Sequence, residues 1–177
     1  MAQSSLLSRA RRAKPGREQP EGPRPGDDGA VKLGPLAETL GFHLRLAQEA
    51  SFAAFARKVG DSGLRPGHYA ALTIIHQNPG LSQTALGAAV RRDKSTLTPM
   101  VAELERRGLI RRDRVPSDRR SYALSLTPAG GEALATLQDH AAAHDRELDL
   151  LVGADQRQAF LDALRRLMAG LEWDNAE

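Results

Sequence analysis

The sequence predicts a mainly α-helical fold that contains one small β-hairpin, and three observations support this. Apolar residues recur at helical spacing along most of the chain after residue 35. Two short stretches, 109–110 and 122–126, have the composition of strands, and the second alternates apolar with polar residues. Between them lies the turn sequence Val-Pro-Ser-Asp at 115–118. A helix followed by such a hairpin is the outline of a winged helix-turn-helix with a two-stranded wing.

Composition limits the possible functions. With 177 residues, the chain can hold one medium domain, or one domain plus a tail. It has no cysteine, which excludes disulfides, a thiol nucleophile and thiolate zinc sites. No apolar run is long enough for a membrane span, and the N-terminus lacks the apolar region of a secretory signal. We therefore expect a cytoplasmic protein.

The order of elements follows from local signals. Residues 1–30 are rich in Pro, Gly and Arg and are expected to form a disordered tail before a folded domain at 31–177. Helices are predicted at 35–59 and from Pro66 to Asn78, with a loop at 60–63. Ser82 is expected to cap a short helix at 83–90, and Asp93 to cap the next helix, which Gly108 ends.

The remaining helices predict a dimer. Thr127 followed by Pro128 is a strong start signal for a helix to about 151, and a last helix is expected from Ala154. The winged helix-turn-helix then covers about 64–127. The helices at about 35–60 and 128–172 are too apolar for a small winged domain alone. We expect them to pair with a second copy in a homodimer.

Charge is distributed unevenly. Residues 91–120 contain ten Lys or Arg and five Asp or Glu, whereas residues 128–177 contain four Arg and ten acids. A solvated helix face could explain each region. The basic region, however, coincides with the predicted helix and wing, which favours contact with a polyanion such as DNA.

Two segments resemble the MarR family of bacterial transcription regulators. DRRSYALSLTPAG at 118–130 is similar to the family's wing signature, an Asp-x-Arg followed by a strand ending Leu-Thr-x-x-Gly. DKSTLTPMVAELERRGLI at 93–110 is similar to its recognition helix and following strand. The resemblance covers roughly 33–171. It implies a dimer that binds double-stranded DNA at a pseudo-palindromic operator and usually represses transcription until a small anion binds.

Candidate DNA contacts follow from the predicted elements. The start of the recognition helix should reach base edges, the arginines before it should bind phosphates, and the wing tip should enter the minor groove. Asp118 would be repelled by DNA and is expected to orient a nearby Arg. Arg111, Arg112 and Arg114 alternate along a strand and cannot all face DNA. Pro99 departs from the general family pattern and could bend the recognition helix. The predicted DNA contacts are Arg91, Arg92, Lys94, Ser95, Thr96, Thr98, Arg119 and Arg120.

A ligand pocket is also predicted. The stretches LGFHLRLAQ at 40–48 and LRPGHYAALTIIHQNPG at 64–80 resemble a branch of the family that responds to aromatic acids or their CoA thioesters. A pocket needs a few polar groups in an apolar wall. Candidates for these groups are His43, Arg45, His68, Tyr69 and His144. A rival is zinc sensing by His140 and His144, which are four residues apart on a helix.

Enzyme hypotheses find no support, because the sequence lacks the GxSxG, Walker A, GxGxxG and HExxH motifs. We expect no cofactor. The remaining alternative is a winged helix that serves only in protein interaction or dimerisation, without DNA binding.

Overall fold

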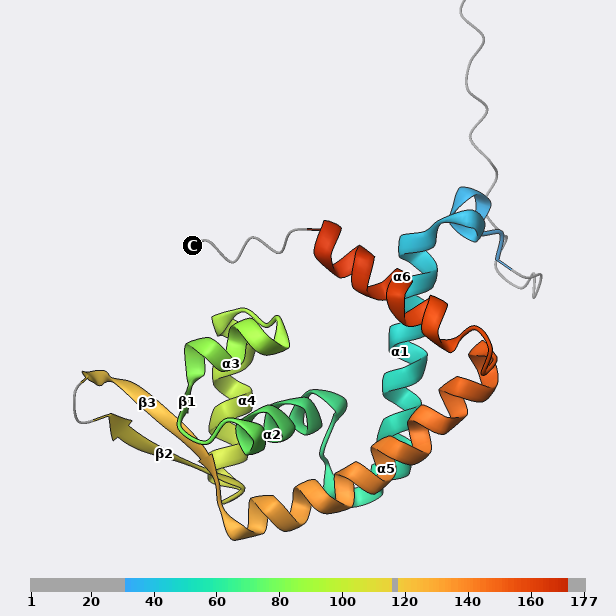
Figure 1. Ribbon diagram of the computed structural model, residues 1–177. Coiled ribbons are helices and arrows are strands. Elements are labelled where there is room, and N and C mark those ends of the chain that lie inside the picture. Colours follow the sequence, from blue (N-terminus) through green and yellow to red (C-terminus); the bar gives the residue numbers. More distant parts are fainter. Residues whose placement is uncertain (1–30, 116–117, 172–177) are drawn as a thin grey trace, which may run out of the picture. The chain divides into compact units, whose positions relative to one another are not determined.

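The computed structural model describes residues 31–115 and 118–171, and leaves aside the side chains of 61, 115 and 118–121. The chain divides into residues 1–42 and 43–177. The predicted tail at 1–30 lies outside the described residues. The elements are η1 (Gly34–Glu38), α1 (Leu40–Val59), η2 (Gly60–Ser62), α2 (Pro66–Gln77), β1 (Leu81–Ser82), α3 (Gln83–Val90), α4 (Lys94–Arg106), β2 (Ile110–Val115), β3 (Asp118–Leu126), α5 (Pro128–Val152) and α6 (Arg157–Gly170) (Figure 1).

Three side-chain caps position the helices, as predicted. The Ser82 hydroxyl accepts from the Ala85 amide at 3.1 Å, and the Asp93 carboxylate accepts from the Thr96 amide at 2.8 Å. The Thr127 hydroxyl accepts from the Gly130 amide at 3.0 Å. Each bond satisfies an amide that has no partner within its own helix. Between α3 and α4, Arg91 turns the chain in the left-handed region, with φ 49°.

The sheet has three strands, not the two that the sequence predicted. Strand β3 lies between β2 and β1, and both pairs are antiparallel. Leu81 pairs with Leu124, and Ser82 pairs with Ala123. On its other edge, β3 pairs with β2. This pairing begins with Ile110 opposite Leu126 and runs toward the tip of the hairpin. The wing hairpin is therefore bonded to the residues that immediately precede α3.

Several boundaries also differ from prediction. The helix expected at 35–59 is divided into the 3₁₀ turn η1 and α1, which begins at Leu40, and the expected loop at 60–63 includes a second 3₁₀ turn, η2. The wing strands are longer than the predicted stretches 109–110 and 122–126, and the last helix begins at Arg157, since residues 154–156 form a turn. The main core is formed by apolar side chains of α2, α3, α4 and the sheet. Side chains from the end of α1 and from the first half of α5 complete it. Its largest fully buried members are Leu72, Ile75, Leu86, Leu104, Ile110, Leu124, Leu137 and Val101.

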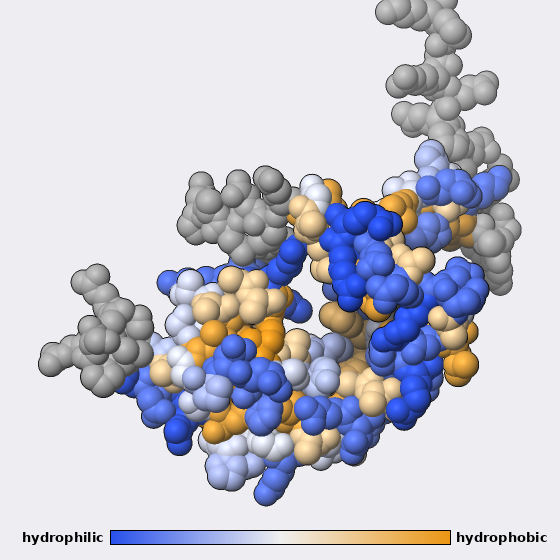
Figure 2. Space-filling view, in the orientation of Figure 1, coloured by the Kyte–Doolittle hydropathy of each residue, from blue (hydrophilic) through white to orange (hydrophobic). Residues whose placement is uncertain are grey.

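Helix α6 behaves differently from the helices of the core, because none of its residues is buried. Its surface in Figure 2 is mainly hydrophilic toward the viewer, with apolar residues beside it. Phe160 and Met168 are exposed on this helix, and Leu150 and Leu151 are 84% and 83% exposed at the end of α5. Across the described residues, no helix is both long and apolar enough to cross a membrane.

Candidate nucleic-acid interface and ligand-binding residues

The first turn of α4 is organised by Asp93. Its carboxylate accepts from the Ser95 hydroxyl at 2.5 Å, and from the amide and hydroxyl of Thr96 at 2.8 and 3.0 Å. The Ser95 hydroxyl, followed by the two Thr96 groups, lowers the pKa of Asp93 to about 2. Both hydroxyl hydrogens therefore point to Asp93, which leaves the oxygen lone pairs as acceptors for a base edge.

The second turn of α4 brings in a residue that sequence reasoning missed. The Gln83 side-chain amide, at the start of α3, donates to the Thr98 hydroxyl at 3.0 Å. Its position at the first residue of the helix after Ser82 was the available signal. Lys94 is exposed at the start of α4, and α4 continues as one α-helix through Pro99. The exposed start of α4 therefore offers both hydrogen-bond donors and hydrogen-bond acceptors, which can pair with the edge of a base in the major groove.

The two arginines before α4 have different surroundings. Arg91 is exposed, and its guanidinium donates to the Met168 carbonyl near the end of α6 at 2.9 Å. Arg92 is half-buried, and a Cβ added at Gly67 would lie 3.7 Å from one of its terminal nitrogens. A DNA phosphate would therefore have to compete with a helix end for Arg91.

The wing arginines also have separate partners. Arg111 pairs with Asp113 at 2.9 Å, whereas Arg112 pairs with Glu105 of α4 and lies over the Tyr122 ring, 5.6 Å from its centre. The hydrogen bond to Glu105 raises the pKa of Arg112. Arg114 is exposed. Asp118, Arg119 and Arg120 begin β3, and their side chains lie outside the described part of the chain.

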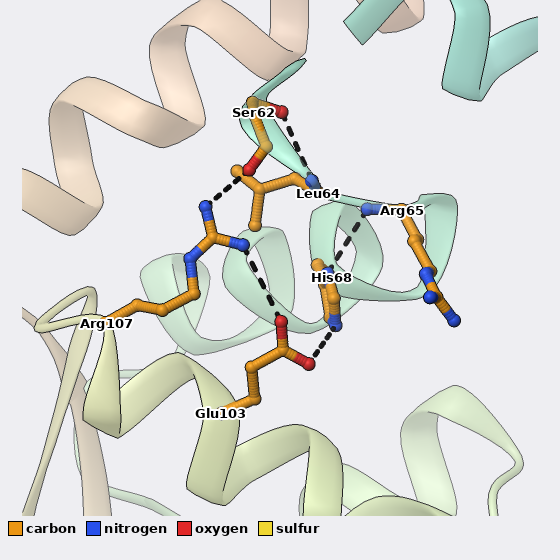
Figure 3. Close-up of polar contacts among 6 residues, drawn as sticks. All are labelled: Ser62, Leu64, Arg65, His68, Glu103 and Arg107. Atoms are coloured by element: carbon orange, nitrogen blue, oxygen red, sulfur yellow. Dashed lines mark hydrogen bonds and ion pairs between the residues drawn. The ribbon is translucent and has the colours of Figure 1, made fainter. Parts of the chain in front are cut away.

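A polar network links α2, η2 and α4 (Figure 3). The buried His68 ring accepts from the Arg65 amide through Nδ1 at 3.2 Å, and its Nε2 lies 3.6 Å from a Glu103 carboxylate oxygen. Arg107 lies 3.7 Å from the other Glu103 oxygen and donates to the Ser62 carbonyl at 2.6 Å. Burial, the largest effect, lowers the pKa of His68 despite the nearby Glu103. His68 is thus directed at α4.

Two other predicted ligand residues meet in a separate aromatic cluster of Ser51, Phe55, Tyr69 and His144. The Phe55 ring centre lies 6.2 Å from that of Tyr69 and 5.9 Å from that of His144. His144 is 8% exposed and shares a 2.9 Å hydrogen bond with the Ser51 hydroxyl through Nε2. Its buried Nδ1 has no hydrogen-bond partner among the residues that the structure describes. Ser51 and Phe55 were missed, although they lie four residues apart on the predicted first helix.

The remaining ligand candidates lie elsewhere. His43 and Arg45 are exposed on α1, and Arg45 pairs with Glu49 at 2.6 Å. The zinc alternative gains no support from geometry: Ser51 occupies Nε2 of His144, while His140 lines a cavity whose lining does not include His144. In the part of the chain that the structure describes, no three His, Cys, Asp or Glu side chains are grouped to hold a metal ion.

A helix-turn-helix with an exposed polar helix start, joined to a basic hairpin, defines a DNA-binding transcription regulator of the winged-helix class. The model of the MarR family matches residues 64–122. A protein of Thauera aromatica, named as a regulatory protein for the hcr operon, is 42% identical over 135 residues, covering 76% of this chain and 81% of its own. The chain belongs to the MarR family.

Solved structures agree with this assignment. The repressor CouR bound to a 23-mer DNA duplex is 36% identical, with a TM-score of 0.72 over 78% of this chain and 98% of CouR. The PcaV regulator of Streptomyces coelicolor, in complex with its natural ligand, is 31% identical, with a TM-score of 0.73 over 81% of this chain and 99% of PcaV. These relatives are regulators. The chain is a DNA-binding transcription regulator and not an enzyme, and the interaction-module alternative is not supported.

Proposed function

We propose that this protein is a homodimeric repressor that binds a pseudo-palindromic operator and releases it when an aromatic carboxylate or its CoA thioester binds at the Ser51–Phe55–Tyr69–His144 cluster. The observation that carries the effector half is the buried Nδ1 of His144, which has no hydrogen-bond partner among the described residues. The His144 ring lies beside Phe55, and Phe55 lies beside Tyr69. A buried polar atom without a partner is costly, and a ligand that supplies one removes that cost.

The DNA half rests on the polar start of α4 and the basic wing. Lys94, Ser95, Thr96 and Thr98 would face the bases from the major groove. Arg91 and Arg92 would bind phosphates. Arg119 and Arg120 would reach the minor groove, with Asp118 orienting one of them. CouR, the similar repressor named above, is bound to a DNA duplex in its solved structure.

The dimer accounts for the apolar surface that a single protomer leaves exposed. Leu150, Leu151, Phe160 and Met168 lie on the last two helices, and Leu40 lies at the start of α1. Apolar side chains on helices outside a core gain about 25 cal/mol for each Å² that a second copy covers. Two copies related by a twofold axis would present two α4 helices to two half-sites.

An aromatic acid suits the cluster for two reasons. A flat ring can stack on or meet the edges of Phe55 and Tyr69, and a carboxylate or thioester oxygen can accept from the Nδ1–H of the tautomer in which Nε2 accepts from Ser51. CouR has also been solved with p-coumaroyl-CoA, at 33% identity to this chain. Release requires that the ligand prefer the DNA-free state, and a hundredfold preference corresponds to about 2.7 kcal/mol.

The test titrates a pre-formed protein–operator complex with benzoate- and cinnamate-type acids and their CoA esters. Release should occur with at least one compound and should weaken in His144→Phe, which keeps a ring but removes Nδ1. The DNA affinity of His144→Phe without ligand serves as the control. Release that is unchanged in His144→Phe would refute the cluster as the site, and zinc alone causing release would favour a metal effector.

The DNA half is tested independently by salt. Neutralising several phosphates makes log K fall with log[salt] at a slope of about −0.9 per phosphate contact. We expect a steep loss of operator affinity between low and physiological salt. A flat response would contradict the DNA-contact residues named here.

A further inference from the structure

Two exposed hydroxyl groups at the start of α4 are held in a single hydrogen-bond sense. Ser95 donates to one carboxylate oxygen of Asp93 at 2.5 Å, and Thr96 donates to the other at 3.0 Å. A carboxylate carries no hydrogen and a hydroxyl carries only one, so both side chains use their single hydrogen on Asp93. Toward a DNA duplex, each hydroxyl oxygen can therefore only accept.

The ionised state of Asp93 maintains this arrangement. The bonds from Ser95 and then from Thr96 lower the pKa of Asp93 to about 2, so the carboxylate stays charged at every pH used to measure DNA binding. Hydrogen bonds to a charged group are about twice as strong as those between neutral groups. A base that required a hydrogen from Ser95 or Thr96 would replace a stronger bond by a weaker one.

The Thr98 hydroxyl, one turn further along α4, has a different partner. It accepts from the side-chain amide of Gln83 at 3.0 Å, and this bond does not use the hydrogen of Thr98. Thr98 is exposed and can donate as well as accept. The start of α4 thus presents two hydroxyls that only accept, followed by one that can also donate.

Base edges in the major groove distinguish these two kinds of hydroxyl. Adenine N6 and cytosine N4 are amino donors, whereas guanine O6 and thymine O4 are keto acceptors. A hydroxyl that only accepts pairs with an amino group, and opposite a keto oxygen it leaves two acceptors unpaired. We propose that Asp93 is a positioning residue for base specificity: by fixing Ser95 and Thr96 as acceptors, it selects adenine or cytosine over guanine or thymine at the bases that they face. This inference rests on the proposed placement of α4 in the major groove.

The geometry of the cap makes Asp93→Asn a selective test. The Thr96 amide donates to the same carboxylate oxygen as Ser95, at 2.8 Å. In the variant this backbone N–H requires the remaining oxygen at that place, so the new NH₂ group faces the Thr96 hydroxyl instead. Thr96 then accepts from the NH₂ group and can direct its own hydrogen toward DNA. Ser95 still donates to the oxygen, so the preference should reverse at the Thr96 position alone.

The experiment selects preferred duplexes from a random-sequence library with the full chain, and then titrates single-base changes. Ser95→Ala, Thr96→Val and Thr98→Val identify the base position that each side chain faces. We expect the natural sequence to prefer adenine or cytosine by about tenfold at the first two positions, because an unpaired polar group costs on that order. In Asp93→Asn the preference at the Thr96 position should shift to guanine or thymine, with the other two positions unchanged.

Loss of a negative charge from Asp93 also strengthens affinity for all duplexes alike. The measured quantity is therefore the ratio of affinities between bases. Asp113→Asn is the matched control, because it removes the same charge from an exposed residue whose described partner is Arg111. Its base preferences should equal those of the natural sequence.

A second measurement needs no variant of Asp93, and it decides if Asp93→Asn fails to fold in a thermal melt. Duplexes in which the base facing Ser95 or Thr96 carries hydrogen in place of its amino group should bind the natural sequence severalfold more weakly. Undiminished binding of these duplexes, a natural preference for guanine or thymine, or an unchanged preference at the Thr96 position in Asp93→Asn would overturn the proposal and leave α4 as the base-reading helix. Unchanged preferences in all three hydroxyl variants would refute the placement of α4 itself, and this inference with it.

Discussion

The Nε2 atom of His68 on α2 lies 3.6 Å from a carboxylate oxygen of Glu103 on α4, with the imidazole buried between the two helices. Because Nδ1 accepts from the Arg65 amide, the neutral ring carries its proton on Nε2, toward Glu103. The neutral form thus satisfies both neighbours without placing a charge in the core.

This arrangement predicts a pH dependence of stability. The pKa of His68 is lowered by burial from 6.5, so the unfolded chain takes up a proton before the folded chain does. The free energy of unfolding should therefore fall as pH drops below about 6.5 and level off below the folded pKa. Denaturant melts of the natural sequence and His68→Gln should converge at low pH, because the glutamine variant lacks this contribution. Parallel curves would contradict the assignment.

Glu103→Gln tests whether the charge of Glu103 raises the pKa of His68. The charge of Glu103 raises the pKa of His68 against the effect of burial. Its removal should lower the pKa of His68 further and extend the loss of stability to lower pH. NMR titration of the His68 ring would measure this directly. An unchanged pKa of His68 in the variant would show that Glu103 does not act on the ring, and a higher pKa would contradict the expected sign.

Gly130 and Gly131 offer a matched pair in the first turns of α5. A Cβ at Gly130 would lie 1.9 Å from the Leu109 carbonyl oxygen, whereas a Cβ at Gly131 meets nothing within 4 Å. Gly130→Ala should destabilise the protein by about 1–3 kcal/mol or more, because backbone must move. Gly131→Ala should stabilise it by about 0.5–1 kcal/mol through the lower entropy of the unfolded chain. Thermal melts that shift in the same direction would contradict this.

Asp93 is predicted to stabilise α4 as a charged cap. Asp93→Ala removes the acceptor for Ser95 and Thr96 and should lower the melting temperature, whereas Asp93→Asn keeps one acceptor oxygen and should melt between Asp93→Ala and the natural sequence at neutral pH. With a pKa of about 2, Asp93 keeps its stabilising effect above about pH 4, and that effect fades as pH falls through 2. Equal melting of the two variants would mean that the cap has no effect.

Substitution of Arg112 should affect the stability of the protein, whereas substitution of Arg114 should affect DNA binding. Arg112 pairs with Glu105 and lies over Tyr122, so Arg112→Ala should lower the melting temperature. Arg114 is exposed, so Arg114→Ala should leave the melt unchanged. In operator titrations at several salt concentrations, Arg114→Ala should reduce the salt slope by about one. An unchanged slope would exclude Arg114 as a phosphate contact.

Signals local to the chain predicted most of the fold. Ser82, Asp93 and Thr127 were identified as caps from their residue type and the periodicity after them, and all three accept the expected amide. Strand β1 could not be predicted, because two residues carry no periodicity and their pairing depends on β3, about forty residues later.

The predicted ligand residues show the same limit at the level of side chains. His68 and Tyr69 are adjacent on α2, and neighbours on a helix point about 100° apart. One therefore contacts Glu103 on α4, while the other contacts Phe55 on α1. Residue type identified His68 and Tyr69 as candidate ligand residues. Their separation into two different clusters depends on which helices pack against each face of α2.

Strand β1 has a mechanical consequence. Ser82 is both a sheet residue paired with the wing strand and the cap of α3, so the base of the hairpin is joined directly to the helix-turn-helix. A duplex that touches both α4 and the base of the wing would meet two contact points whose separation this pairing restricts. A sequence whose grooves do not match that separation must bend or twist to fit, and stiff sequences will pay more energy for it than flexible ones. Bases that the protein never touches would then contribute to operator choice.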